Sequence, residues 1–281
     1  MINVAKLLNI FQKNVDKLGY DFFLQPDIEK IEDLEELKGD VVFFVDKSGN
    51  LSKLRNDYTK SVINHLKRNN ISRAKFWYSG FVYRYSVSNG LFSQYQLGLE
   101  KIPFGNVKDG VEIIRTILES YIETFSSKLL LEIGDSRVIE EAVKDFPEQK
   151  RKEVLKIVDT KNTAELEVFG ELNDLEVEKL LQIIYSSFEK RKIGEINQLN
   201  IPYEVKRDVE ELLSLLPEYT NVEIEIDFSI ARTVEEYHGL TFTIYDLSTS
   251  KLVAAGGKYR LYDDLYGIGG TIFLEDKAWL I

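Results

Sequence analysis

The chain has 281 residues, 44% of them hydrophobic and 12% aromatic, which is enough for one large domain or two small ones around a buried core. Acidic residues outnumber basic ones by 47 to 36, and the net charge of −11 disfavours nucleic acid as the main partner. With no cysteine and only two histidines, disulfides and thiol chemistry are excluded, and no metal or other cofactor is expected.

The start of the chain does not resemble a signal peptide, and no segment resembles a membrane span. Lys6, Gln12 and Asp16 interrupt what would have to be the apolar core of a signal, and no run of about 18 apolar residues occurs. We therefore expect a cytoplasmic protein with no membrane contact. The 30% of charged residues and the single methionine resemble a heat-adapted composition.

The first half of the chain mixes helical and strand patterns. Apolar residues at intervals of three and four predict helices, and runs rich in β-branched and aromatic residues predict strands. In chain order we first expect a helix over 4–18 ended by Gly19, an extended segment over 20–26 and a hairpin joining 41–45 to 51–55. A helix capped by Asn56 or Asp57 and ending at 69–70 follows, and then a long antiparallel hairpin over 74–104. A helix over 111–125 and a buried strand over 129–133 complete this half.

The second half begins with short, charged amphipathic helices and ends with strands. The helical part covers about 136–217, with expected breaks near 160–162, Gly170 and Gly194, and strand patterns return from Val222. Since both ends of the chain are strand-rich, we expect an α+β fold: one antiparallel sheet flanked by helices and interrupted by an all-helical insertion.

Four short clusters at expected strand edges or turns carry residues suited to binding a ligand: 54–59, 81–85 with its return strand 94–100, 231–242 and 254–259. Alternate residues of a strand share a face, so Gln94, Gln96 and either Gly98 or Glu100 point the same way, and Arg84 opposes its neighbours Tyr83 and Tyr85. An arginine, an amide and a carboxylate on one sheet face suit a small zwitterion with a polar side chain.

Spacing alone favours a plainer interpretation of the same clusters. Arg84, Gln96 and Glu100 then form an internal ion pair and hydrogen bonds on a partly exposed face. Gly256 and Gly257, which permit the close approach of a ligand at a strand end, then form an ordinary turn.

In their order along the chain, the four clusters resemble the catalytic core of class II aminoacyl-tRNA synthetases, and within it the histidyl branch. Residues 54–59 (Leu-Arg-Asn-Asp-Tyr-Thr) stand where that branch has Leu-Arg-Pro-Glu-Gly-Thr. Tyr83-Arg84 and the run from Gln96 to Glu100 are similar to its second class motif, and 232–242 and 255–259 resemble its two histidine-specific signatures. The resemblance covers 1–135 and 222–281, and implies that 136–217 is the insertion.

Two departures from that branch imply that adenylation and tRNA recognition are lost. Asp276 stands where the third motif has an arginine that holds the terminal phosphates of the nucleotide, and a carboxylate there repels a triphosphate. The sequence ends at Ile281, so we expect no anticodon-binding domain.

This combination is similar to the synthetase paralogues that serve as regulatory subunits of ATP phosphoribosyltransferase, the first enzyme of histidine biosynthesis. The resemblance implies a non-catalytic subunit that associates with a short catalytic subunit, is required for its activity and takes part in feedback inhibition by histidine. It also implies a homodimer within a hetero-oligomer, paired through the opening helix and 20–26, with no tRNA partner.

Two other functions remain open at this point. One is a minimal histidine-activating or amino-acid-ligating enzyme of the same fold, and the other is a structural adaptor with an inactive pocket.

The resemblance further implies that the amino-acid half of the old site still binds free histidine. The implied set is Asp57 and Gln96 for the α-ammonium, Arg84 or Arg232 for the carboxylate, Glu100 and Tyr237 for the imidazole, and Gly256 and Gly257 as pocket glycines. We expect His238 to be structural and His65 to have no role.

Overall fold

The computed structural model describes residues 2–31, 37, 39–86, 90–188, 201–230, 237–262 and 264–274. The chain forms two compact units. The first comprises Met1–Pro103, Thr116–Ser126 and Gly269–Ile281, and the second comprises Phe104–Arg115 and Ser127–Ile268.

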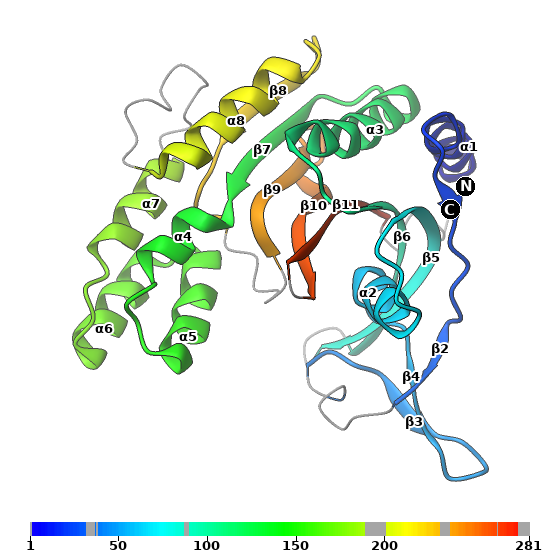
Figure 1. The fold of residues 1–281 in the computed structure, drawn as a ribbon, viewed down its shortest axis with the longest axis horizontal. Helices are drawn as coiled ribbons and strands as arrows, with labels where there is room; N and C mark the ends of the chain where they lie inside the picture. Colours follow the sequence, from blue (N-terminus) through cyan, green and yellow to red (C-terminus); the bar gives the residue numbers. More distant parts are fainter. Residues whose placement is uncertain are drawn as a thin grey trace. The chain divides into compact units, whose positions relative to one another are not determined.

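The first unit contains a long hairpin and a small three-stranded sheet (Figure 1). Its elements are α1 (Ile2–Lys17), β1 (Asp21–Phe22), β2 (Ile28–Lys30), β3 (Phe43–Val45), β4 (Leu51–Leu54), α2 (Tyr58–Arg68), β5 (Ala74–Ser86), β6 (Gly90–Ile102) and the C-terminal parts of α3 (Val107–Phe125) and β11 (Leu265–Leu274). Strands β5 and β6 pair antiparallel, β1 joins β5 in parallel, and the small sheet has the order β2-β4-β3.

Local sequence signals explain the start of this unit. Val4, Leu7, Phe11 and Val15 form the buried stripe of α1, and Gly19 adopts a φ of 75° just after the helix, as predicted. The predicted hairpin is confirmed as β3 and β4. Its turn is held by Asp46, whose Oδ1 accepts from the backbone N–H groups of the residues two and four positions later.

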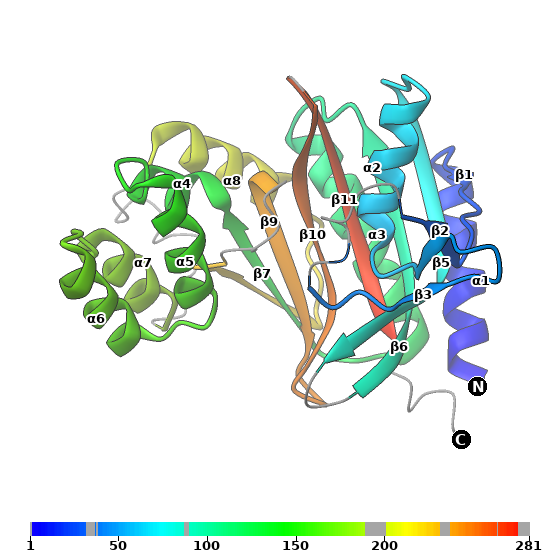
Figure 2. The same cartoon turned by 90° about the horizontal axis from the view of Figure 1, so that it is seen from below.

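The second unit contains a sheet of order β10-β9-β7-β8, with β11 beside β10. Its elements are the N-terminal part of α3, β7 (Leu129–Asp135), α4 (Ser136–Ala142), α5 (Glu148–Asp159), α6 (Thr163–Asn173), α7 (Glu178–Phe188), α8 (Tyr203–Leu215), β8 (Val222–Ile226), β9 (Tyr237–Asp246), β10 (Lys251–Tyr262) and the N-terminal part of β11. Figure 2 shows β7, β9 and β10 side by side.

The predicted α+β class is confirmed, but the strands are not all antiparallel. The pairs β7–β8 and β1–β5 are parallel. A parallel pair needs a long crossover connection, and helices α4 to α8 supply it between β7 and β8. The expectation of a wholly antiparallel sheet is therefore wrong at these two pairs.

Helices α4 to α7 pack around one apolar cluster of the second unit (Figures 1 and 2). The predicted break near residue 161 is confirmed between α5 and α6, but α6 runs through Gly170. A Cβ at Gly170 would lie 2.9 Å from Val177 Cγ2, so this glycine permits close packing and does not end a helix. Gly194 lies outside the described residues. The division into a synthetase-like core and an insertion stays a prediction.

In the part of the chain that the structure describes, no helix is long and apolar enough to cross a membrane. The same residues contain no group of three or more acidic or histidine side chains arranged to hold a metal ion.

Candidate functional site

One face of the β5–β6 hairpin carries three of the predicted site residues. In the register of the two strands, Arg84 lies opposite Phe92, Gln96 opposite Gly80, and Glu100 opposite Phe76. Directly paired residues of antiparallel strands project to the same side, so the side chains of Arg84, Gln96 and Glu100 share one face.

Glu100 is the most enclosed of these residues, with only 1% of its surface exposed. Its Oε1 accepts from Thr59 Oγ1 at 2.9 Å and from the Tyr78 hydroxyl at 3.4 Å. Gly269 of β11 lies so close that a Cβ there would overlap the Glu100 carboxylate. The carboxylate is therefore held in one position by hydroxyl groups and by a glycine.

A buried aromatic stack lies beside this carboxylate. The Tyr58 and Tyr78 rings are stacked with centroids 4.2 Å apart, and the Arg55 guanidinium lies 4.0 Å from the Tyr58 centroid. Burial raises the pKa of Tyr58 to about 12, and burial and the nearby Glu100 raise the pKa of Tyr78. Both phenols therefore stay protonated and can donate hydrogen bonds.

Arg55 fixes one end of this stack, a role that the sequence pattern did not suggest. Its side chain is 1% exposed, and Nη2 donates to Asp27 Oδ1 and to the Phe81 carbonyl oxygen, both at 2.7 Å. Nη1 donates to the carbonyl oxygens of Gln25 and Pro26. Only the tertiary fold brings these acceptors together, so no local signal could have identified them.

Asp57 lies at the N-terminus of α2, as predicted for a cap. Its Oδ1 accepts from the backbone N–H of Lys60 at 2.9 Å. The neighbouring Asn56 carbonyl accepts from Arg84 Nε at 3.1 Å, so Asp57 and Arg84 lie near each other.

The polar side chains of this face make specific contacts. Arg84 pairs with Asp40 at 3.3 Å, and Gln96 is 4% exposed and donates to Gln94 Oε1 at 3.1 Å. The plainer interpretation therefore correctly anticipates an ion pair for Arg84, but its partner is Asp40.

The remaining predicted site residues belong to the second unit or are not described. Tyr237 is the first residue of β9 and pairs with Tyr259 of β10. Gly256 and Gly257 lie inside β10, so the expectation of a strand end or a turn is wrong. A Cβ at Gly257 would lie 2.6 Å from the Leu240 carbonyl oxygen and 3.0 Å from the Tyr237 ring. This glycine therefore lets Tyr237 pack onto the strand.

Arg232 lies outside the described residues, as does Asp276, on which the expected loss of nucleotide binding rests.

The two histidines have structural contacts. His238 Nδ1 lies 2.8 Å from Glu140 Oε2, and its ring stacks on Tyr266 with centroids 5.5 Å apart. Burial opposes ionisation of Glu140, but hydrogen bonds from His238 and Ser136 lower its pKa overall. The His65 ring meets Phe23 edge-on.

Comparison with known proteins places this geometry in a family. A family model for histidyl-tRNA synthetase matches residues 2–271. The ATP phosphoribosyltransferase regulatory subunit of Thermotoga maritima is 42% identical, over 99% of this chain and 98% of that protein. The histidine–tRNA ligase of Sulfurisphaera tokodaii is 25% identical, over 97% of this chain and 70% of that protein.

Solved structures give the same result. A chain in the ATP phosphoribosyl transferase (HisG:HisZ) complex from Thermotoga maritima matches with a TM-score of 0.83 and 40% identity, over 98% of both chains. Histidyl-tRNA synthetase from Nostoc sp. PCC 7120 matches with a TM-score of 0.74 and 15% identity, over 96% of this chain and 69% of that one, which supports the fold alone.

The fold is thus of the class II synthetase type, and the chain belongs to the histidyl-tRNA synthetase family. Within that family it belongs to the regulatory subunits of ATP phosphoribosyltransferase, because its similarity to one of them extends over nearly the whole of both chains.

Proposed function

We propose that this chain is required for the activity of a short ATP phosphoribosyltransferase catalytic subunit and conveys feedback inhibition by free histidine to it. It acts in the cytoplasm, does not itself catalyse the transfer, and binds no tRNA. The observation that carries the proposal is the 42% identity with the Thermotoga maritima regulatory subunit over 99% of this chain.

The first unit offers suitable partners for free histidine. Glu100 is a buried acceptor in a fixed position, which suits an imidazole N–H group, and Gln96 lies on the same face. Asp57 caps α2 through Oδ1, and within the described part of the chain Oδ2 is left to accept from the α-ammonium group. Arg84 would share its guanidinium between Asp40 and the ligand carboxylate.

The expected affinity suits a feedback metabolite. Each charge-assisted hydrogen bond contributes roughly 1.5–3 kcal/mol net, so two or three of them give binding in the micromolar to millimolar range after the costs of association. The histidine-binding roles of Arg232, Tyr237, Gly256 and Gly257 stay predictions.

Reconstitution tests the regulatory function. We expect phosphoribosyl-ATP to form when this chain is mixed with a short catalytic subunit, and not when either protein is alone. Equal activity of the catalytic subunit with and without this chain would overturn the proposal. Histidine-dependent exchange of pyrophosphate into ATP by this chain alone would favour the alternative of a histidine-activating enzyme.

A pair of substitutions at Asp57 separates histidine binding from helix capping. Asp57→Asn keeps a good cap but removes the charge, so we expect normal stability and at least about tenfold weaker histidine binding. Asp57→Ala should weaken binding similarly and also destabilise the protein by about 0.5–2 kcal/mol. Calorimetric titration and urea unfolding measure the two effects. Unchanged histidine affinity in Asp57→Asn would remove Asp57 from the site.

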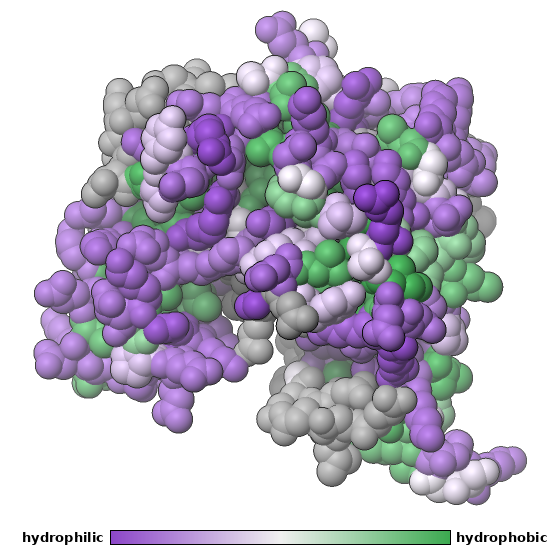
Figure 3. Space-filling view, in the orientation of Figure 1, coloured by the Kyte–Doolittle hydropathy of each residue, from purple (hydrophilic) through white to green (hydrophobic). Residues whose placement is uncertain are grey.

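We also propose that two copies pair through α1 and the segment 20–26 that follows it, as the synthetase resemblance implies. Three apolar side chains in and beside this segment are exposed: Leu18 by 37%, Phe22 by 48% and Leu24 by 81%. Figure 3 shows hydrophobic side chains gathered along the segment between α1 and β2. Exposed apolar patches of this kind are typical of protein interfaces.

A further inference from the structure

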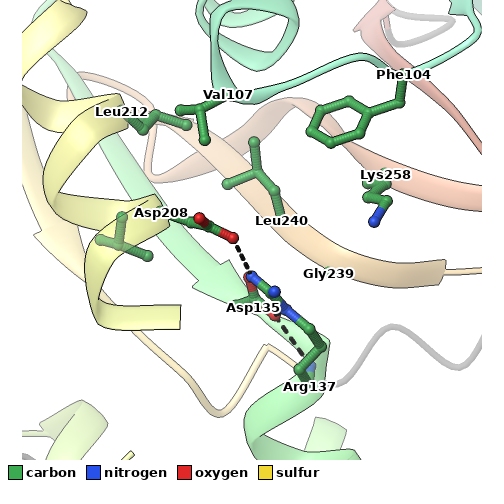
Figure 4. A pocket seen from close by; sticks show the side chains of 10 residues that line it. Phe104, Val107, Asp135, Arg137, Asp208, Leu212, Gly239, Leu240 and Lys258 are labelled. Carbon is green, nitrogen blue, oxygen red and sulfur yellow. Dashed lines mark hydrogen bonds and ion pairs between the residues drawn. The ribbon is translucent and has the colours of Figure 1, made fainter. Parts of the chain in front are cut away.

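A small cavity in the second unit has none of the residues assigned above to histidine in its lining. It has a volume of about 30 Å³, which is room for roughly two or three water-sized groups. Six elements and the connection before α3 contribute to it. Its lining residues are Phe104, Val107, Asp135, Arg137, Asp208, Val209, Leu212, Gly239, Leu240 and Lys258 (Figure 4).

Lys258 of β10 supplies an unusual cation to this cavity. Its Nζ lies 5.0 Å from the centroid of the Phe104 ring and 4.3 Å from that of the Tyr266 ring. Among the described residues, no carboxylate lies within ion-pairing distance of this ammonium group. Burial, followed by the nearby charge of Arg137, lowers the pKa of Lys258.

The two carboxylates that line the cavity are already occupied by arginines. Asp135 is 1% exposed and accepts from Arg137 Nε at 2.8 Å and from Nη2 at 2.7 Å. Asp208 accepts from Arg137 Nη2 and from Arg207 Nη2, both at 2.8 Å. Figure 4 shows Arg137 between the two aspartates, with Lys258 apart from them. As far as the described residues show, the ammonium group of Lys258 therefore has no anionic partner in the cavity.

Gly239 of the neighbouring strand β9 determines the path of the Lys258 side chain. Gly239 has a φ of 111°, and a Cβ there would lie 3.1 Å from Lys258 Cδ. A larger residue at 239 would be strained and would press on the lysine side chain. The glycine thus gives the aliphatic stem of Lys258 its path toward the cavity.

The rest of the wall is apolar. Val107 of α3, Leu212 of α8 and Leu240 of β9 lie around the cavity in Figure 4. A fully hydrated anion would lose water against these side chains without replacement, whereas a short alkyl group fits them.

We propose that this cavity binds a small carboxylate, about the size of acetate, as a second ligand of the protein. The carboxylate group pairs with Lys258 Nζ, and the alkyl end lies against Val107, Leu212 and Leu240. A ligand ammonium is disfavoured because Asp135 and Asp208 already bind arginine.

Thermal unfolding of the full chain at constant ionic strength tests this proposal. Sodium acetate replaces sodium chloride in one arm, and inorganic phosphate replaces it in another. With a dissociation constant of about 10 mM, 100 mM acetate should raise the midpoint by roughly 3 °C, and phosphate should have less effect. Lys258→Met should weaken acetate binding at least about tenfold, while the matched control Lys251→Met, on the same strand but exposed, should not.

Two further measurements distinguish a loss of acetate binding from poor folding of Lys258→Met. Val107→Phe fills the cavity and leaves Lys258 in place, so it should also abolish the response to acetate. In the unmodified chain, acetate should raise the pKa of Lys258 followed by ¹³C NMR, because a bound anion favours the ammonium form. The proposal is overturned if acetate has no effect, if Lys258→Met responds as fully as the unmodified chain, or if phosphate is the stronger ligand.

Discussion

Tyr78 shows how single residues fix the polar face of the β5–β6 hairpin. Its hydroxyl lies 2.8 Å from Thr271 Oγ1 and 3.4 Å from Glu100 Oε1, and its ring stacks on Tyr58. Gly98 faces the ring from the paired strand, and a Cβ at this position would overlap it. A side chain at position 98 would therefore push the ring out of its stacked position.

Gly98→Ala should therefore destabilise the protein by about 1–3 kcal/mol and weaken histidine binding, because the displaced ring no longer positions Glu100. Urea unfolding and calorimetric titration measure the two effects. Gly105→Ala is the matched control, since its Cβ would meet only Asp109 Oδ2, at 3.2 Å. If Gly98→Ala proved as stable as this control, the stack would not be rigid.

At the residue scale, the sequence predicted the shared face of Arg84, Gln96 and Glu100, because alternation along a strand is a local property. It could not predict the contacts of Arg55 and Tyr78, because their partners are distant in the chain and meet only after folding.

At the scale of elements, one ion pair joins the turn between α5 and α6 to the end of β8. Lys161 Nζ lies 2.6 Å from Asp227 Oδ2, and the Asp227 side chain is 5% exposed. Burial opposes the charge of Lys161, but the bond to Asp227 raises its pKa overall.

Lys161→Met leaves the Asp227 carboxylate buried without this cation and should cost about 1–3 kcal/mol of stability at pH 7. Because the folded-state pKa of Lys161 lies above 10.5, the contribution is fully present below that pH and is lost as the pH rises through the folded-state value. Urea unfolding from pH 7 to pH 11 should show the two proteins converging. Lys156→Met, an exposed change on α5, serves as control. A constant difference across this range would show that the ion pair is not responsible.

The sequence identified most elements of the described chain, because helical spacing and strand composition are local signals. It misjudged Gly170 and the pair Gly256-Gly257, since a glycine that permits close packing and one that breaks an element look alike in sequence. It did not predict the parallel direction of β1 and β8, because strand direction within a sheet depends on the crossover and not on composition.

For the whole molecule, the exposed segment after α1 makes dimerisation testable. Leu24 is 81% exposed, so Leu24→Asp should leave the fold intact and shift the chain from dimer to monomer in sedimentation velocity. Lys156→Asp, a charge change at an exposed position of α5 outside the proposed interface, is the control for a general charge effect. Dimers that persist in Leu24→Asp would place the interface elsewhere.

On the proposed function, a synthetase-like site in this chain senses histidine on behalf of the catalytic subunit. Histidine can shift the partner only by its difference in affinity between active and inhibited assemblies, typically about 1–3 kcal/mol. The most direct measurement is histidine inhibition of phosphoribosyl-ATP formation by the reconstituted complex, with the unmodified chain and with Glu100→Gln. We expect the unmodified complex to be inhibited by histidine, and the Glu100→Gln complex to assemble and keep its activity but need at least about tenfold more histidine. Equal inhibition of the two complexes would contradict the account.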